Sequence, residues 1–384
     1  MPELVALDLP GGAGFVDALR AIWDTGDAAA PIDPRLPKAA RNALFDTLRP
    51  TRHVGSDGEL HALHGGSPVE EGDALVVATS GSSGQPKGVV LTHDALAASA
   101  RATSDRLGID PQRHAWLACL PLAHIGGLSV VARALLTGTP LKVLPDFQAE
   151  IAERIGRSGE ATHVSLVSTA LGRLDPSVFE GILLGGGRPP DVLPDNVVVT
   201  YGMTETGSGV VYDGVPLEDV EVAIAHFEDA GDDAIDGEIL VRAPMMMRCY
   251  RDGDPARVRG PDGLHTWFAT GDAGYVGADM KLHVAGRLAD VIVTGGEKVW
   301  PDAIEPLLAQ HPSVAEVAVW KRPDPEWGER VVAWVVPTDS EPKLEEFGDL
   351  VSEAIGAWAV PKELVITDQL PRTPSGKLRR RELR

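Results

Sequence analysis

Short apolar runs recur along the first two hundred residues and predict buried strands at residues 74–78, 164–167, 181–184 and 196–200. Amphipathic stretches with helical spacing separate several of these runs. The clearest helix follows Thr92, a good N-cap residue, and ends at Gly108, which can adopt the left-handed C-cap conformation. Because strands and helices alternate, we expect a largely parallel sheet.

The pattern changes after residue 213. From there to about residue 286, short strands such as 237–242 and 281–286 lie between turns rich in Gly, Asp and Pro, which predicts an all-β lobe. Beyond Arg287 the pattern predicts a compact α+β module. Its expected elements are strands at 291–293, 314–320, 331–336 and 363–367, a helix with Pro301 in its first turn, and a helix over 343–358.

Length and composition agree with a large α/β body and an appended module. At roughly 150 residues per domain, 384 residues allow two or three domains. Apolar residues at 43% and charged residues at 24% are ordinary globular values, and 42 glycines with 30 prolines favour a loop-rich α/β chain over a coiled coil. We expect a large N-terminal domain of α/β sheets with a β lobe over residues 1–286, a hinge at 287–290, and a small α+β domain over 291–384.

The charge balance and the cysteines exclude several classes of function. The net charge of −21 repels nucleic-acid phosphates and anionic membranes, so we expect neither as a partner. Cys119 and Cys249 lie far apart and outside any CxxC motif, which excludes a disulfide framework and a structural zinc site. The N-terminus lacks the basic residues of a signal peptide, and no apolar stretch approaches about 20 residues. We therefore expect a cytoplasmic protein without membrane insertion.

The strongest local signal is TSGSSGQPKG at residues 79–88, directly after the predicted strand 74–78. Its glycines and hydroxyl side chains can present donors to phosphate oxygens, and Lys87 supplies positive charge. The residue order differs from that of a Walker A loop. A flexible surface linker is the alternative, but a linker has no need of Pro-Lys-Gly between two apolar strands.

This loop resembles the signature loop of the adenylate-forming superfamily of acyl-CoA synthetases, adenylation domains and luciferases. Five further segments resemble that family's motifs in the same order. They are an acyl-pocket segment at 117–130, a nucleotide and magnesium motif at 201–206, a ribose motif at 270–272, a hinge with its following loop at 286–301, and a catalytic-lysine motif at 371–377. The chain is therefore identified as a member of this superfamily, and its small C-terminal domain is expected to be mobile.

The resemblance implies a role for each candidate site residue. Lys377, Glu205 and His124 are the expected catalytic residues, with Glu205 as the magnesium ligand and His124 also lining the acyl pocket. ATP is expected to contact Thr79, Ser80, Gly81, Ser82, Ser83, Gly84, Lys87, Gly185, Gly186, Gly187, Tyr201, Gly202, Thr204, Asp272 and Arg287.

Several of these assignments also have a physical reason. Glu205 should project at the carboxyl end of a strand, where open α/β sheets bind ligands, and Mg²⁺ accepts one carboxylate together with phosphate oxygens. Asp272 can accept hydrogen bonds from both ribose hydroxyls. Residues 185–187 let the backbone approach a flat ring, which Tyr201 would cover from the other side. The alternatives are a solvated glutamate, a common Thr-Gly-Asp turn, a tight glycine turn, and, for His124, a core histidine.

Two departures from the family pattern change the picture. The hinge residue is usually Asp or Lys, and here that position is Ala289, followed by Asp290. The segment before the phosphate loop has only 78 residues, shorter than in most relatives, which favours a small substrate.

Within the superfamily, the chain most resembles the short form of the o-succinylbenzoate:CoA ligases of menaquinone biosynthesis. Thr169 and Arg173 match a threonine and a basic residue that lie near the substrate in those ligases, although Arg173 could equally be an exposed helix residue. An inward guanidinium suits the second, unactivated carboxylate of o-succinylbenzoate. Gly295 and Gly296 would border the coenzyme A tunnel.

The expected activity is an acid–thiol ligase that uses ATP, Mg²⁺ and coenzyme A and works through an acyl-adenylate. Three alternatives stay open. The chain could act on another small aryl or acyl acid, it could be a luciferase-like or stand-alone adenylating enzyme that loads a carrier protein, or it could be a nucleotide-binding regulatory protein without catalysis. Small molecules are the expected partners, together with a second copy in a homodimer.

Overall fold

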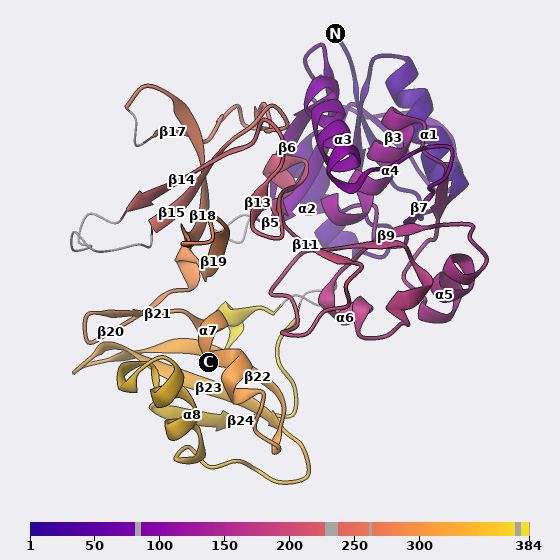
Figure 1. Ribbon diagram of the computed structural model, residues 1–384. Helices are drawn as coiled ribbons and strands as arrows, with labels where there is room; N and C mark the ends of the chain where they lie inside the picture. The colour runs from indigo at the N-terminus through magenta and orange to yellow at the C-terminus, as the bar shows by residue number, and fades with distance from the viewer. Residues whose placement is uncertain (81–85, 227–236, 261–262, 373–377, 384) are drawn as a thin grey trace. The chain divides into compact units, whose positions relative to one another are not determined.

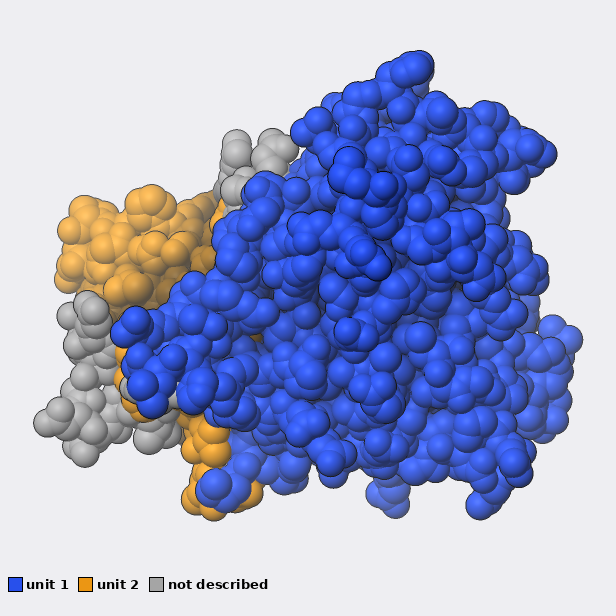
Figure 2. Space-filling model, turned by 90° about the horizontal axis from the view of Figure 1, so that it is seen from above, with its two compact units in different colours: residues 1–223, 240–269, 280–282 blue, residues 224–239, 270–279, 283–384 orange. Residues whose placement is uncertain are grey.

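The computed structural model describes residues 1–384 apart from 81–85, 227–236, 261–262, 373–377 and 384 (Figure 1). The chain divides into two compact units, coloured separately in Figure 2. Unit 1 comprises Met1–Ala223, Leu240–Ala269 and Met280–Leu282, and unit 2 comprises Ile224–Ile239, Thr270–Asp279 and His283–Arg384. Because the two units alternate along the chain, the expected domain division, with a hinge at residues 287–290, stays a prediction.

The first sheet lies in unit 1 and has seven strands in the order β16-β6-β5-β2-β1-β3-β4. Their bounds are β1 Leu4–Leu7, β2 Ala28–Pro31, β3 Arg52–Val54, β4 Leu60–Ala62, β5 Asp73–Ser80, β6 Pro86–Thr92 and β16 Cys249–Tyr250. Three neighbouring pairs are parallel and three are antiparallel. The expectation of a largely parallel sheet is therefore wrong here, because β5 turns back into β6 through the predicted phosphate loop.

Helices α1 (Ala13–Asp24) and α2 (Lys38–Leu48) lie between the first strands of this sheet in the sequence. The last residue of α2, Leu48, is fully buried and belongs to the same core cluster as Val76 of β5 and Val90 of β6. This packing fixes α2 against the hairpin that carries the predicted phosphate loop.

The second sheet also lies in unit 1, in the order β13-β12-β11-β10-β9-β7-β8. The bounds are β7 Trp116–Ala118, β8 Leu141–Val143, β9 His163–Leu166, β10 Gly181–Leu184, β11 Val197–Met203, β12 Ser208–Tyr212 and β13 Val215–Pro216. The five strands from β11 to β8 are parallel neighbours, which confirms the parallel sheet at this place. Three helices and two 3-10 helices accompany it: α4 Ile125–Thr137, α5 Ala149–Arg157, α6 Ser168–Leu171, η1 Pro176–Val178 and η2 Thr204–Thr206.

Helix α3 spans His93–Leu107, which confirms the boundaries expected from the sequence. The Thr92 hydroxyl accepts a hydrogen bond of 3.1 Å from the backbone N–H of Ala95, and Gly108 ends the helix with φ of 63°. Both ends are therefore set by local chemistry that needs no partner elsewhere in the fold.

The third sheet has the order β14-β15-β18-β17, with β19 paired to β18. The bounds are β14 Glu221–His226, β15 Gly237–Arg242, β17 Arg257–Arg259, β18 Thr266–Val276 and β19 Leu282–Arg287. Among the described residues from 213 to 286 every regular element is a strand, which confirms the β texture. The lobe is not a single sheet, however, because β13 joins the second sheet and β16 the first.

The fourth sheet forms the core of unit 2, in the order β21-β20-β23-β22 with β24 beside β23. The bounds are β20 Ile292–Thr294, β21 Glu297–Val299, β22 Val314–Asp324, β23 Gly328–Pro337, β24 Glu363–Ile366, α7 Pro301–Leu308, α8 Glu346–Ala354, η3 Leu288–Asp290, η4 Ala357–Ala359 and η5 Arg380–Glu382. This confirms the α+β module. Helix α8 is shorter than expected, since Gly356 takes φ of 142° and leaves the helical conformation.

Both cysteines are buried free thiols. Burial raises the pKa of Cys119 to about 12 and also raises the pKa of Cys249. Within the described ranges, no helix has the length and apolar character needed to cross a bilayer.

Glu305 on α7 is a mostly buried carboxylate, with its side chain 18% exposed, and its titration should affect the unfolding free energy. Burial raises its pKa to about 7, although Arg380 lies beside it and favours the charged form. The ordinary pKa of a glutamate is 4.5, so the folded state binds the Glu305 proton more tightly than the unfolded chain does. Binding of this proton therefore stabilises the fold fully in acid, and this stabilisation is lost as the pH rises through about 7.

We expect the unfolding free energy of the wild type to fall by about 2 to 3 kcal/mol relative to Glu305→Gln between pH 5 and pH 8. Denaturant titrations of both proteins across this range measure the difference. Glu353→Gln, which changes an exposed carboxylate on α8, is the matched control and should follow the wild type. A constant difference between Glu305→Gln and wild type would show that Glu305 titrates normally.

Candidate active site

The predicted phosphate loop joins β5 to β6, which pair as an antiparallel hairpin with Thr79 opposite Lys87. Loop residues 81–84 lie outside the described residues, as does the side chain of Ser80. A Cβ atom at Gly88 would lie 2.7 Å from the Leu48 side chain of α2. The glycine after Lys87 therefore lets α2 pack against the hairpin next to the loop.

Lys87 lies at one end of a chain of three side chains in unit 1. Its Nζ is 4.4 Å from the centre of the Tyr250 ring, within the range of a cation–π interaction. The Tyr250 hydroxyl donates a hydrogen bond of 2.9 Å to Oε1 of Glu205. Glu205 stands in η2, directly after the carboxyl end of β11, which confirms its expected place in the fold.

Tyr250 is the residue that sequence analysis missed. Burial raises the pKa of its hydroxyl, and the Glu205 carboxylate raises it further, so Tyr250 stays protonated and donates to Glu205. Its strand, β16, has two residues and pairs with β6 across more than 150 positions of sequence. No local pattern connects such a short strand to Glu205.

The donor set at Glu205 fits Mg²⁺. The carboxylate offers hard oxygen ligands, Tyr250 orients it through Oε1, and Lys87 brings positive charge to the same place for phosphate oxygens. The backbone carbonyl of Glu205 accepts a hydrogen bond of 2.7 Å from Met247 N–H, which ties η2 to the segment before β16.

The glycine turn at residues 185–187 follows β10, beside Tyr201 on β11. Gly186 has φ of 86°, and a Cβ atom at Gly185 would lie 2.8 Å from the Thr200 hydroxyl. Strand β11 runs beyond the expected residue 200 to Met203 because it pairs with β12. Gly202 is required there, since a Cβ atom would lie 2.2 Å from the Ser208 carbonyl oxygen.

Helix α6 lies against this glycine turn. The Ser168 hydroxyl donates a hydrogen bond of 3.0 Å to the carbonyl of Arg188, just after the turn. Thr169 is exposed on α6, and Arg173 is exposed two residues beyond its end, with its guanidinium 5.4 Å from the centre of the Phe147 ring. Arg173 is thus not on the helix, and its role toward a substrate stays a prediction.

His124 is exposed and precedes α4, so the alternative of a core histidine is wrong. Partial desolvation lowers its pKa, with Arg35 acting in the same direction and Asp33 opposing it. The ring is therefore neutral at physiological pH and can donate or accept one hydrogen bond at each nitrogen.

Asp272 and Arg287 form an ion pair within unit 2. Asp272 is 4% exposed, and its Oδ1 lies 2.8 Å from Nε of Arg287. The Thr-Gly-Asp segment is not an isolated turn, because it lies inside β18, where Gly271 has φ of 71°. The Thr270 hydroxyl accepts a hydrogen bond of 3.1 Å from Asp272 N–H and so fixes this irregular backbone.

Gly295 and Gly296 form the two-residue turn between β20 and β21. Their φ angles of 60° and 90° require glycine in this type of hairpin turn. The ring of Trp327 lies against Gly295, where a Cβ atom would come within 2.7 Å. The backbone of the turn is therefore exposed with an aromatic ring beside it.

Lys377 lies outside the described residues. On either side of it, Arg372 and Leu378 form an antiparallel bridge, and Arg379 N–H donates a hydrogen bond of 2.8 Å to the Pro371 carbonyl. Ala289, at the expected hinge, is exposed in η3.

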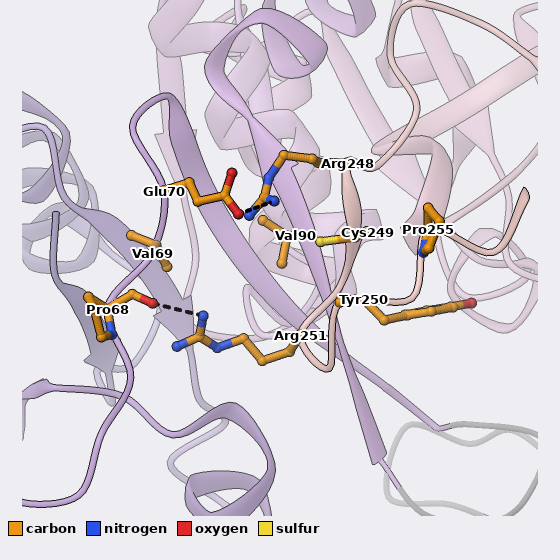
Figure 3. Close-up of a pocket in the computed structure, with 10 residues that line it drawn as sticks. Pro68, Val69, Glu70, Val90, Arg248, Cys249, Tyr250, Arg251 and Pro255 are labelled. Atoms are coloured by element: carbon orange, nitrogen blue, oxygen red, sulfur yellow. Dashed lines mark hydrogen bonds and ion pairs between the residues drawn. The ribbon is translucent and has the colours of Figure 1, made fainter. Parts of the chain in front are cut away.

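A pocket of about 380 Å³ lies around β16 in unit 1. Figure 3 shows the residues that line it. Arg248 and Glu70 lie on one side of it, and the Tyr250 ring extends away from both. The residues that line this pocket include Tyr250 but none of the site residues predicted from the sequence.

Comparison with known proteins identifies the same family as the sequence motifs. The model of the AMP-binding enzyme family matches residues 61–251, and the model of the AMP-binding enzyme C-terminal domain matches residues 303–377. A probable 2-succinylbenzoate–CoA ligase from Mycobacterium tuberculosis is 36% identical over 361 residues, covering 87% of this chain and 89% of the relative.

Solved structures of the same family resemble this chain over nearly its whole length. The o-succinylbenzoate CoA synthetase MenE from Bacillus subtilis, in complex with the acyl-adenylate intermediate OSB-AMP, has a TM-score of 0.86 and 28% identity, covering 99% of this chain and 88% of its own. The same enzyme with ATP and a magnesium ion has a TM-score of 0.84. This chain thus has the adenylate-forming fold, with a large N-terminal and a small C-terminal domain. It belongs to the family of AMP-binding, adenylate-forming acid–CoA ligases.

Proposed function

We propose that the chain is an ATP-dependent ligase that joins o-succinylbenzoate to coenzyme A in menaquinone biosynthesis. A carboxylate oxygen of the acid attacks the α-phosphorus of ATP, which forms an acyl-adenylate and releases pyrophosphate. The thiol of coenzyme A then attacks the acyl carbon, and AMP leaves. The observation that carries the proposal is the row of side-chain contacts from Lys87 through Tyr250 to Glu205. These contacts connect the end of the phosphate loop to the expected metal ligand.

In unit 1 we assign phosphate binding to residues 79–84 and Lys87, and adenine binding to residues 185–187 and Tyr201. Bound Mg²⁺ would neutralise charge on the phosphates, and Glu205 would hold it. Gly202 would bring the backbone close to the nucleotide, and Thr204 would add a hydroxyl donor.

In unit 2 we assign ribose binding to Asp272 and Arg287. Lys377 would stabilise charge between the α-phosphate and the acid during adenylation. Rotation of the C-terminal domain about residues 287–290 would then bring Gly295 and Gly296 to the coenzyme A thiol for the second step.

The acid would lie between His124 and α6. Two features support this place: α6 packs beside the glycine turn, and Thr169 and Arg173 are both exposed there. The reacting carboxylate must face the phosphates, so the second carboxylate would point toward Arg173. The Phe147 ring beside this guanidinium offers a surface for the aromatic ring of the acid.

We expect Arg173→Leu to raise KM for o-succinylbenzoate about ten- to hundredfold, since a charge-assisted hydrogen bond contributes roughly 1.5 to 3 kcal/mol. Steady-state formation of AMP with coenzyme A present measures this, with KM for ATP as an internal reference. Arg154→Leu, an exposed arginine on α5, is the matched control and should retain the wild-type KM. Unchanged turnover of o-succinylbenzoate by Arg173→Leu would contradict the assignment.

A screen of carboxylic acids with and without free coenzyme A tests the function itself. The proposal expects o-succinylbenzoate to give the fastest AMP release, accelerated by coenzyme A. Preference for an acid with a single carboxylate would point to another aryl- or acyl-CoA ligase, and indifference to coenzyme A would point to a carrier-loading enzyme. A homodimer and a cytoplasmic location stay predictions from sequence.

A further inference from the structure

A single guanidinium in unit 2 contacts carboxylates from two separate segments. Nη2 of Arg380 lies 2.7 Å from Oδ1 of Asp302 and 2.7 Å from Oε2 of Glu305, both on α7. Nη1 of Arg380 lies 3.6 Å from Oδ2 of Asp290, the last residue of η3. Arg380 thus links the C-terminal segment to α7 and to the expected hinge.

This cluster is partly shielded from water, with the Asp290 and Asp302 side chains 25% and 35% exposed. The Arg380 side chain is 14% exposed and that of Glu305 is 18% exposed. Glu305 also accepts a hydrogen bond of 2.7 Å from Val319 N–H, which fixes its orientation. Loss of one partner from such a partly shielded ion cluster leaves the charges of the others uncompensated, so the guanidinium helps to hold this geometry.

The segment around Arg380 is anchored by packing as well. Leu383 is 7% exposed and lies in the core cluster that contains Trp320 and Trp334, with Leu378 packed against it. Leu370 lies in the same cluster, so packing anchors the described chain on both sides of Lys377, and on the C-terminal side it includes the next residue, Leu378.

Arg379 and Arg381 flank Arg380 in the sequence, but both side chains are exposed. Arg379 pairs with Glu382 on an exposed surface, at 2.9 Å. The three consecutive arginines therefore separate into one half-buried residue, Arg380, and two exposed residues.

We propose that Arg380 is a positioning residue for adenylation, which fixes the segment that follows Lys377 relative to the hinge. This inference rests on the proposed function, in which Lys377 acts in the first half-reaction and the hinge turns between the two. With a pivot of Ala289, which has no polar side chain, Asp290 is the hinge residue through which the C-terminal segment contacts η3. Displacement of a reacting group by about 1 Å can lower a rate about a hundredfold.

The test measures the two half-reactions separately in Arg380→Ala, Arg380→Lys and Asp290→Asn. We expect Arg380→Ala to lower kcat of o-succinylbenzoate-dependent pyrophosphate exchange about ten- to hundredfold, with KM for ATP within about twofold of wild type. The rate of thioester formation from synthetic acyl-adenylate by Arg380→Ala should stay within about twofold of the wild-type rate. Arg380→Lys keeps one ion pair and should recover part of the rate.

Asp290→Asn separates positioning from folding, because it leaves the pairs between Arg380 and α7 in place. We expect it to lower kcat of exchange severalfold with little change in Tm. Arg379→Ala is the matched control and should behave as wild type in both half-reactions.

If the wild-type enzyme shows exchange activity, either of two results would overturn this inference and leave the proposed function in place. One is normal exchange by Arg380→Ala, and the other is equal loss of both half-reactions in proportion to a lowered Tm, which indicates a purely structural role. Absence of exchange in the wild type with every acid tested would instead overturn the proposed function, and this inference with it.

Discussion

Lys377→Ala should lower the rate of acyl-adenylate formation by about 10²- to 10³-fold, the usual cost of removing one charged contact from a transition state. The reaction between coenzyme A and preformed acyl-adenylate should be nearly unaffected, because in the proposed cycle the C-terminal domain presents Gly295 and Gly296 in that step. Pyrophosphate exchange and thioester formation from synthetic adenylate measure the two rates.

Lys343→Ala is the matched control for this variant, since it removes an exposed lysine from the same unit. It should retain both rates. Equal impairment of both half-reactions by Lys377→Ala would contradict domain rotation and indicate one fixed active site.

Glu205→Gln should lower the adenylation rate by about 10²-fold at limiting Mg²⁺, because an amide is a much weaker ligand than a carboxylate for a hard cation. Nucleotide affinity should change less, since residues 185–187, Tyr201 and Asp272 remain. Raising the Mg²⁺ concentration should recover part of the rate, and a Mg²⁺ titration of exchange activity measures this.

Tyr250→Phe is the informative companion of Glu205→Gln. It removes the 2.9 Å hydrogen bond that orients the carboxylate but keeps the ring beside Lys87. We expect a smaller rise in the Mg²⁺ requirement than for Glu205→Gln. Glu218→Gln, an exposed carboxylate in the same unit, is the control, and an unchanged Mg²⁺ dependence of Glu205→Gln would exclude Glu205 as the ligand.

The features that sequence predicted well are those set within a few residues. Thr92 and Gly108 fix the two ends of α3 by capping, and Pro301 begins α7, so each can be found in a short window. Residues 185–187 and Glu205 follow apolar strands directly, which places them at strand ends without knowledge of the sheet.

The features that sequence missed depend on pairing across long distances. The contact between Tyr250 and Glu205 and the pairing of Arg380 with α7 join residues 45 or more positions apart. The antiparallel return of β6 beside β5 is local, but the sequence pattern does not fix the direction in which the strands pair. The exposure of His124 also depends on neighbours that its apolar flanking sequence does not reveal. The roles of individual site residues stay predictions, because they depend on bound substrates.

The burial of Cys119 and Cys249 has a practical consequence for assays of the second half-reaction. A thiol reacts with aromatic disulfide reagents as its thiolate, and both side chains are shielded and hold their protons well above neutral pH. These are the two cysteines of the sequence. In a native sample, colour from such a reagent should therefore report on unreacted coenzyme A alone, and thioester formation can be followed as its disappearance.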